Sequence, residues 1–217
     1  MSETVLFLAN SEQERLITYD EAITAMEDAY EEYGRKIAKT IPRQRLNTPK
    51  GEENLYHWFN VIPGVVPGNG TAAIRLNSTS LSITEKRGTS RFEYPGAFSG
   101  LVLLFDVDSN ELLAVLQDFY LNPLRVAATS AIATKRLAPR KASTMGVFGS
   151  GTQATTHITY TCQVRDLDEI RVYSTNADRR DAFAERMDER VEPDVVPVDS
   201  ARDAASGCDI GLTATNA

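Results

Sequence analysis

The stretch Met145-Gly-Val-Phe-Gly149-Ser-Gly151-Thr-Gln153-Ala154 decides the fold of this chain. It begins as a short apolar strand, turns through two glycines and continues as the start of a helix. This is the G-x-G-x-x-G/A pattern of a dinucleotide-binding βαβ unit. We expect Gly149 to permit the tight turn, and Gly151 to let backbone N–H groups approach a pyrophosphate. Ala154 is expected to keep the helix close to the strand.

The neighbouring residues support the same interpretation. The N-terminus of a helix carries partial positive charge and unpaired N–H donors, which suit a diphosphate. A second strand, Glu169-Ile-Arg-Val-Tyr173, follows at the distance that the motif requires. Ser150 and Thr152 are expected to serve the turn and the helix cap, where they can also touch phosphate. The predicted cofactor-binding residues of this turn are Gly149, Ser150, Gly151, Thr152, Gln153 and Ala154.

Strands and helices alternate after this turn. We predict strands at 144–148, 169–173, 194–197 and 208–214, and helices at 152–163, 177–190 and near 200–206. The order β-α-β-α-β-α-β indicates a parallel, doubly wound sheet. The sequence therefore predicts a Rossmann domain over residues 141–217.

The N-terminal half has a mixed pattern. The capping box Thr18-Tyr-Asp-Glu21 precedes apolar residues spaced three and four apart, which predicts an amphipathic helix ending near Gly34. Residues 41–70 are interpreted as strands joined by turns at Pro63-Gly64 and at Pro67-Gly-Asn-Gly70. Residues 84–96 are polar and are expected to form a loop.

Two apolar runs, Leu101–Phe105 and Leu112–Leu116, predict strands joined by a turn. Pro123 is expected to open the long helix that follows, because proline suits a first helical turn. The fold class is therefore α/β: an α+β domain for substrate binding and dimerisation over 1–122, a connecting helix over 123–140, and the Rossmann domain.

Composition narrows the range of partners. The net charge of −7 argues against a general nucleic-acid binder. No apolar run reaches the roughly 18 residues of a membrane span, and the N-terminus lacks the features of a signal peptide. Cys162 and Cys208 form no C-x-x-C pair, and His57 and His157 lie too far apart in sequence to form a zinc ligand set. We expect a cytoplasmic protein without a metal site.

Three separated motifs carry a resemblance to a known family. They are Leu101-Val-Leu-Leu-Phe-Asp with Glu111-Leu-Leu-Ala-Val-Leu, then Leu124-Arg-Val-Ala-Ala-Thr-Ser-Ala, then the glycine turn. In this order they resemble the ornithine cyclodeaminase/mu-crystallin family over essentially the whole chain. The resemblance implies a nicotinamide cofactor, a small amino or imino acid as substrate, and a homodimer built through the N-terminal domain.

The resemblance also implies a set of substrate-binding arginines. Arg125 matches the family arginine that holds the substrate carboxylate, and a guanidinium fork can grip a carboxylate through two bonds. Either Arg43 or Arg45 lies where the family has a further substrate-contacting arginine. Arg75 replaces the usual lysine beside the reacting centre, which makes it the candidate catalytic position. An arginine there can anchor an anion but cannot shuttle a proton at neutral pH.

Other positions depart from the family pattern. Relatives often carry Gln near Ser99 and Asp at Gln117, and Asp118 stands one residue further on. A shift of one residue at a strand end changes the face on which a side chain lies. Relatives also continue past Thr213-Ala-Thr-Asn-Ala217 into further Rossmann strands that include an acid/base aspartate. The Rossmann domain is therefore expected to be incomplete at its C-terminus.

The second Rossmann strand bears on the choice of nicotinamide. An NAD site favours Asp or Glu at the end of that strand, where the acid binds the ribose hydroxyls. Here the strand ends Val172-Tyr-Ser-Thr-Asn176, without an acid. Ser174, Thr175 and the nearby Arg179 and Arg180 can receive a 2′-phosphate, which favours NADP over NAD.

Three functions remain open at this point. The first is an NAD(P)-dependent oxidoreductase, either an amino-acid dehydrogenase or a ketimine or imine reductase. The second is an ornithine cyclodeaminase-like lyase, which releases ammonia with no net change in the cofactor. The third is a non-catalytic protein that holds NADP or a small ligand.

Overall fold

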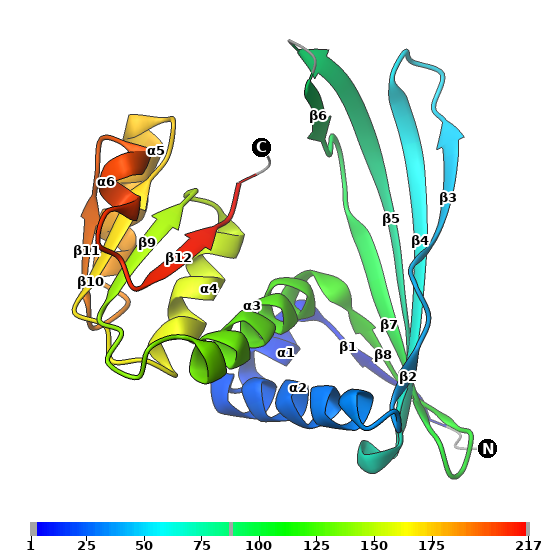
Figure 1. Ribbon diagram of the computed structural model, residues 1–217. Helices are drawn as coiled ribbons and strands as arrows, with labels where there is room; N and C mark the ends of the chain where they lie inside the picture. The colour runs from blue at the N-terminus through cyan, green and yellow to red at the C-terminus, as the bar shows by residue number, and fades with distance from the viewer. Residues whose placement is uncertain (1–3, 87–88, 216–217) are drawn as a thin grey trace. The chain divides into compact units, whose positions relative to one another are not determined.

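The computed structural model describes residues 4–86 and 89–215 and divides into two compact units (Figure 1). Unit 1 comprises residues 4–18 and 28–122 of the described chain, and unit 2 comprises Tyr19–Glu27 and Pro123–Thr215. Two helices, α2 (Tyr19–Gly34) and α3 (Asp118–Leu137), cross the boundary between the units in sequence. The helix α2 starts directly after Thr18 and ends at Gly34, as the capping box and the glycine predicted.

Unit 1 is built on one eight-stranded sheet with the order β1-β8-β7-β5-β4-β2, in which β3 also pairs with β4 and β6 with β5. Except for β1, which runs parallel to β8, neighbouring strands are antiparallel. The long strands β4 and β5 lie side by side in Figure 1. The elements are β1 (Leu6–Leu8), α1 (Asn10–Leu16), β2 (Lys39–Thr40), β3 (Gln44–Pro49), β4 (Leu55–Val66), η1 (Pro67–Asn69), β5 (Thr71–Lys86), β6 (Thr89–Glu93), β7 (Ser99–Asp106) and β8 (Leu112–Gln117).

Two predictions for this sheet were wrong, the turn at Pro63-Gly64 and the loop over 84–96. No turn forms at Pro63-Gly64, because β4 continues through both residues. Pro63 falls between the part of β4 that pairs with β3, ending at Val61, and the part that pairs with β2, starting at Gly64. A proline is tolerated at position 63 because it lacks an N–H group only where neither β2 nor β3 pairs with β4. The turn predicted at Pro67–Gly70 does form, with Gly70 left-handed at φ 65°.

The expected loop over 84–96 is largely a hairpin, because β5 runs to Lys86 and pairs with β6. Thr84, Glu85, Phe92 and Glu93 are all exposed. A strand that buries neither face shows no alternation of polar and apolar residues, and so gives no strand signal in the sequence.

The start of α3 also differs from the prediction. The helix begins at Asp118, so Pro123 lies inside it rather than at its first residue. Asn10 of α1 compensates at the new start, because its Oδ1 accepts a hydrogen bond of 2.9 Å from the backbone N–H of Tyr120. A side chain distant in sequence thus caps the helix, which local patterns cannot reveal.

Unit 2 contains a four-stranded parallel sheet with the order β11-β10-β9-β12. Right-handed crossovers place α4 and α5 on one face and α6 on the other, because the strand order reverses after β11. The predicted alternation of strands and helices is confirmed throughout. The elements are β9 (Thr144–Phe148), α4 (Thr152–Cys162), β10 (Glu169–Tyr173), α5 (Ala177–Asp188), β11 (Asp194–Pro197), α6 (Ala201–Ala205) and β12 (Ile210–Thr213).

The core of unit 2 lies on the α4 and α5 side of this sheet. Met145 and Val147 point to that side, whereas Gly146 between them faces α6. A Cβ on Gly146 would lie 2.2 Å from the carbonyl oxygen of Ala204, so glycine allows α6 to approach β9 closely. The other buried members are Ala154, Ile158, Leu167, Ile170, Val172, Phe183, Ala184, Met187 and Val195.

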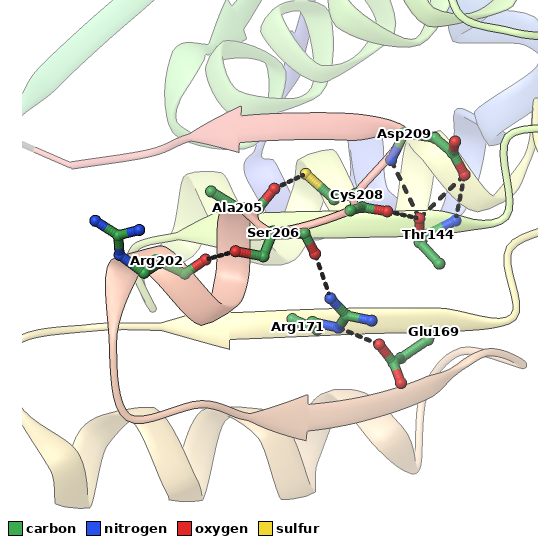
Figure 2. A network of polar contacts seen from close by, with 9 residues as sticks. Thr144, Glu169, Arg171, Arg202, Ala205, Ser206, Cys208 and Asp209 are labelled. Atoms are coloured by element: carbon green, nitrogen blue, oxygen red, sulfur yellow. Dashed lines mark hydrogen bonds and ion pairs between the residues drawn. The ribbon is translucent and has the colours of Figure 1, made fainter.

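A polar network joins the amino ends of these strands, opposite the glycine turn (Figure 2). The Asp209 carboxylate accepts hydrogen bonds from the backbone N–H of Ser143 (2.9 Å) and from the N–H and hydroxyl of Thr144 (3.1 and 3.0 Å). Arg171 donates to the carbonyl of Ser206 at 2.7 Å and pairs with Glu169. The network therefore ties the loop before β12 to both central strands.

Candidate functional site

The glycine turn lies at the carboxyl end of the central strand β9. Gly149 has a φ of +118°, a conformation that L side chains rarely adopt. Its N–H donates to the Tyr173 carbonyl at 2.8 Å, and a Cβ on it would lie 2.4 Å from the Ala214 carbonyl oxygen. Both the backbone conformation and the space available therefore require glycine here.

Gly151 plays a different part from Gly149. It is the N-cap of α4, with extended backbone at φ −105° and no side chain to cap the helix. A Cβ on it would meet nothing within 4 Å, so open space lies before the helix start. Two residues on, the side-chain Oε1 of Gln153 is buried and finds no hydrogen-bond partner among the described residues, and Ala154 is fully buried. Within the described part of the chain, the turn thus presents unpaired helix N–H groups to an open space, as anion binding requires.

The end of β10 supplies the second part of this site. Ser174 is half-buried and Thr175 is exposed. Asn176 caps α5, because its Oδ1 accepts from the backbone N–H of Arg179 at 2.8 Å. The Arg179 side chain is exposed, whereas the neighbouring Arg180 is held by the Val198 carbonyl at 2.9 Å and by two carboxylates. Arg179 is therefore the arginine of this pair that remains available to a ligand.

Unit 1 carries a row of polar side chains across three strands of its sheet. Arg45 on β3 pairs with Asn60 on β4, and Asn60 pairs with Asn77 on β5. Arg45 Nε donates to Asn60 Oδ1 at 2.8 Å, and Asn60 Nδ2 donates to Asn77 Oδ1 at 2.7 Å. The Arg45 guanidinium also lies 3.7 Å above the ring of Trp58. Both asparagines are buried, so this row holds the arginine in one orientation.

Arg75 lies on the same face as this row, two residues before Asn77. Its Nε donates to Oδ2 of Asp118 at 2.6 Å, in an ion pair whose acid is 1% exposed and whose base is 13% exposed. Gly100 makes room for this pair, because a Cβ there would lie 2.9 Å from the Asp118 Cβ. The sequence patterns did not reveal this pair, since Asp118 reaches Arg75 from the first residue of a helix rather than from a strand.

Arg43 adds charge to the same region. The pKa of its guanidinium is lowered by partial desolvation and by the positive charges of Arg45 and Arg75, while Tyr94 acts in the opposite direction. Three of the predicted substrate-binding arginines thus lie near enough to one another in unit 1 for their charges to interact. The structure brings them together with two asparagines and an aspartate that sequence reasoning did not select as site residues.

Gln117, His57 and His157 make contacts or lie in surroundings that suit a structural role. Gln117 Oε1 accepts from the backbone and side-chain nitrogens of Asn10, both at 3.0 Å, which fastens β8 to α1. His57 shares a 2.8 Å hydrogen bond with the hydroxyl of Ser78. His157 is buried in α4, and burial lowers its pKa, which favours the neutral ring.

Arg125 belongs to unit 2, the unit with the glycine turn. It lies half-buried in α3 between the buried residues Leu124 and Ala127, and its carbonyl accepts from the hydroxyl of Thr129 at 2.9 Å. A guanidinium in such an apolar stretch of helix suits the recognition of a buried anion.

These features define a class of protein. The order β11-β10-β9-β12, with a glycine turn where the strand order reverses, is that of a dinucleotide-binding Rossmann unit. It is joined in sequence to an α+β unit whose sheet presents arginines on one face. The chain matches the family model of the ornithine cyclodeaminase/mu-crystallin family over residues 3–217, and it belongs to that family.

Individual relatives agree with this assignment. The chain is 28% identical over 213 residues to a Delta(1)-pyrroline-2-carboxylate reductase of Bacillus cereus, in a match that covers 98% of this chain and 62% of the relative. It is 32% identical over 154 residues to the ketimine reductase mu-crystallin of Mus musculus, in a match that covers 71% of this chain and 47% of the relative. The chain therefore spans less than two thirds of the length of these relatives.

Solved structures show the same fold. The Delta(1)-pyrroline-2-carboxylate reductase of Thermococcus litoralis, in complex with NADH and L-proline, matches with a TM-score of 0.80 at 27% identity, over 97% of this chain and 62% of that one. An archaeal alanine dehydrogenase dimer with bound NAD matches with a TM-score of 0.80 at 25% identity, over 97% and 60%. Within the part of the chain that the structure describes, no helix is both long and apolar enough to cross a membrane.

Proposed function

We propose that this chain provides the substrate-binding and cofactor-binding parts of an NAD(P)-dependent oxidoreductase that acts on a small amino or imino acid. The observation that carries the proposal is the glycine turn, with its open space in front of α4 at Gly151. The reductases among the relatives and the NADH and L-proline in the Thermococcus complex support it.

The chain fits a nicotinamide dinucleotide at this turn. The N–H groups at the start of α4 would hold the pyrophosphate, with Gly149, Ser150, Gly151, Thr152, Gln153 and Ala154 forming the cradle. Ser174, Thr175 and Arg179 would hold a 2′-phosphate, since no acid stands there to bind free ribose hydroxyls. NADP is therefore the cofactor that we propose.

The substrate carboxylate would bind to arginines. In unit 1 we assign carboxylate binding to Arg75, with Arg43 or Arg45 as a further contact, and in unit 2 we assign it to Arg125, as the family resemblance implies. Arg75 would act as an anchor and not as an acid or base, because a guanidinium stays protonated at neutral pH. Its ion pair with Asp118 would fix the direction in which it meets the substrate.

The proposed reaction is the reduction of a carbon–nitrogen double bond. A bound reduced nicotinamide would supply the hydride that the imine carbon accepts, and the imine nitrogen would take up a proton from water. The arginines contribute by holding the imine carbon in one position, and orientation of this kind lowers the barrier without new chemistry. The reverse direction is oxidation of the amino acid.

The experiment is a steady-state assay of the cofactor absorbance with this chain. NADPH or NADH would be mixed with Delta(1)-pyrroline-2-carboxylate, and net oxidation of the cofactor is the expected result. Release of ammonia from ornithine without net change would instead indicate a cyclodeaminase. Saturable cofactor binding without turnover of any amino or oxo acid would indicate a non-catalytic binding protein.

We further propose that the protein is a cytoplasmic homodimer assembled through unit 1. The alanine dehydrogenase of similar fold is a dimer, and both cysteines of this chain are free thiols. Light scattering of the purified chain at several concentrations measures the state of assembly.

A further inference from the structure

Two guanidinium groups in unit 1 are held in the same way. Arg45 Nε donates to Asn60 at 2.8 Å, and Arg75 Nε donates to Asp118 at 2.6 Å. Among the described residues, the terminal nitrogens of neither arginine make a hydrogen bond. Each guanidinium is therefore fixed at Nε and keeps a fork of terminal N–H donors, the part that grips a carboxylate through two bonds.

Both forks belong to the same face of the sheet. The register pairs Arg45 with Asn60 and Asn60 with Asn77, and Arg75 lies two residues from Asn77 on the same strand. Residues two apart on a strand share a face, and strands two apart lie about 10 Å from each other. Because arginine side chains are long, one small molecule can reach both guanidinium groups. The two forks are thus two separate anion-binding positions for a single ligand.

The charges on this face are unbalanced. Arg43, Arg45 and Arg75 carry three positive charges, and Asp118 is the acid that pairs with one of them. The lowered pKa of Arg43 reflects desolvation together with repulsion from both other guanidinium groups. Among the residues named here, a ligand with a single carboxylate would leave one positive charge uncompensated, whereas a ligand with two carboxylates would balance the charge.

We propose that this face of unit 1 binds a small substrate with two carboxylate groups, one on the fork of Arg75 and the other on the fork of Arg45, with Arg43 beside it. The proposal deepens the proposed function by naming a substrate class, an amino or imino dicarboxylic acid, and it rests on that function for the reaction. The binding of the two carboxylates rests on the geometry of unit 1.

A binding experiment tests this without cofactor or turnover. Trp58 is the single tryptophan of the chain and lies against the Arg45 guanidinium, so its fluorescence reports on ligands at that fork. The chain would be titrated with succinate and with succinamate, in which a neutral amide replaces one carboxylate. We expect succinate to bind about 10- to 100-fold more tightly, the range that a charge-assisted hydrogen bond supplies. Equal affinities would overturn the proposal.

Variants locate the second carboxylate. Arg43→Met keeps the stacking of Arg45 on Trp58, and Arg45→Met removes the fork itself. Both are expected to reduce the preference for succinate to within about threefold. Lys50→Met is the matched control, because Lys50 follows the same strand but its Nζ lies 2.9 Å from Ser80 Oγ, on the opposite face. A loss of preference in the control equal to that in Arg45→Met would contradict the assignment.

Turnover provides the second test. L-Aspartate and L-asparagine would be compared as substrates with NADP⁺, in a reaction that moves a hydride from Cα to the cofactor and yields an imino acid and a proton. We expect kcat/KM to favour aspartate by at least about tenfold, and Arg45→Met to lower the value for aspartate alone. Preference for asparagine would overturn the proposal. Selective succinate binding without any turnover would refute the proposed function and leave the dicarboxylate site standing.

Discussion

Asp118 holds Arg75 from the first residue of α3, with 2.6 Å between its Oδ2 and the arginine Nε. The carboxylate is almost fully buried and the guanidinium is mostly buried, so Arg75 depends on Asp118 for compensation of its charge. The pair joins the start of a helix to the middle of β5. It fixes Arg75, the candidate substrate-binding residue that the family resemblance aligns with a lysine.

We therefore expect Asp118→Ala to lower the free energy of unfolding by about 3 kcal/mol, because it leaves a mostly buried guanidinium without its partner. Urea denaturation measures the change. The matched control is Glu31→Ala, which removes the partner of Arg35 in an ion pair whose side chains are 58% and 65% exposed. That change should be below about 0.5 kcal/mol. Equal losses in the two variants would mean that the buried pair contributes no more than a surface pair.

Substitution by alanine should affect stability very differently at two glycines of unit 2, Gly146 and Gly151. Gly146→Ala forces a Cβ against the backbone of α6, so we expect a large loss of stability, of about 3 kcal/mol or more. Gly151→Ala meets open space and an ordinary backbone conformation, and its stability should fall by no more than about 1 kcal/mol, the cost of alanine at an N-cap. Its affinity for NADPH should nevertheless fall at least about tenfold, because the methyl group occupies the place proposed for the pyrophosphate. Thermal unfolding tests the predicted stabilities, and a fluorescence titration of the same samples tests the predicted affinity for NADPH.

The unit 2 fold could be predicted almost completely from the sequence, and the reason is local. Each strand of a parallel sheet is a short apolar run, and each crossover is an amphipathic helix, so both periods are visible in the residues themselves. Gly149 could be assigned to the tight turn for the same reason, since the motif fixes its place between strand and helix.

The structure of unit 1 was harder to predict from the sequence, because the contacts that determine it join residues far apart in the chain. The start of α3 depends on Asn10, more than a hundred residues away, and the continuation of β4 through Pro63 depends on where β2 and β3 end. The arginines of the candidate site were found by residue type and resemblance. Their partners Asn60, Asn77 and Asp118 are ordinary polar residues, and only strand register and helix position bring them to the arginines.

The choice of nicotinamide gives a further prediction. Arg179 is exposed at the start of α5, where a 2′-phosphate would lie, and its side chain makes no hydrogen bond or ion pair with the described residues, unlike that of Arg180. We expect Arg179→Ala to weaken NADPH binding about tenfold and to leave NADH binding unchanged. Arg190→Ala, which removes an exposed arginine just beyond the other end of α5, serves as the control for net charge. Equal effects of Arg179→Ala on both cofactors would remove the structural basis for proposing NADP.

Asp209 predicts how the stability of unit 2 depends on pH. Hydrogen bonds from the backbone N–H groups of Ser143 and Thr144, and from the Thr144 hydroxyl, hold the pKa of its carboxyl below the ordinary value of 3.8. The folded state therefore binds this proton less readily than the unfolded state does. The stabilising contribution is complete above the unfolded pKa and is lost as the pH falls through the lower, folded pKa.

We accordingly expect Asp209→Asn to lower Tm at neutral pH, because one carboxylate oxygen accepts all three hydrogen bonds and a neutral amide oxygen accepts them less strongly. The difference in Tm from the parent should narrow as the pH is lowered below the ordinary carboxyl pKa and through the lower, folded one, because the parent carboxylate then also takes up a proton. Asp178→Asn, at an exposed carboxylate that accepts no hydrogen bond from the described residues, should show little difference at any pH in this range. Calorimetry across the series measures these shifts. A deficit for Asp209→Asn that stays constant down to about pH 2 would show that Asp209 stabilises the loop before β12 without its charge.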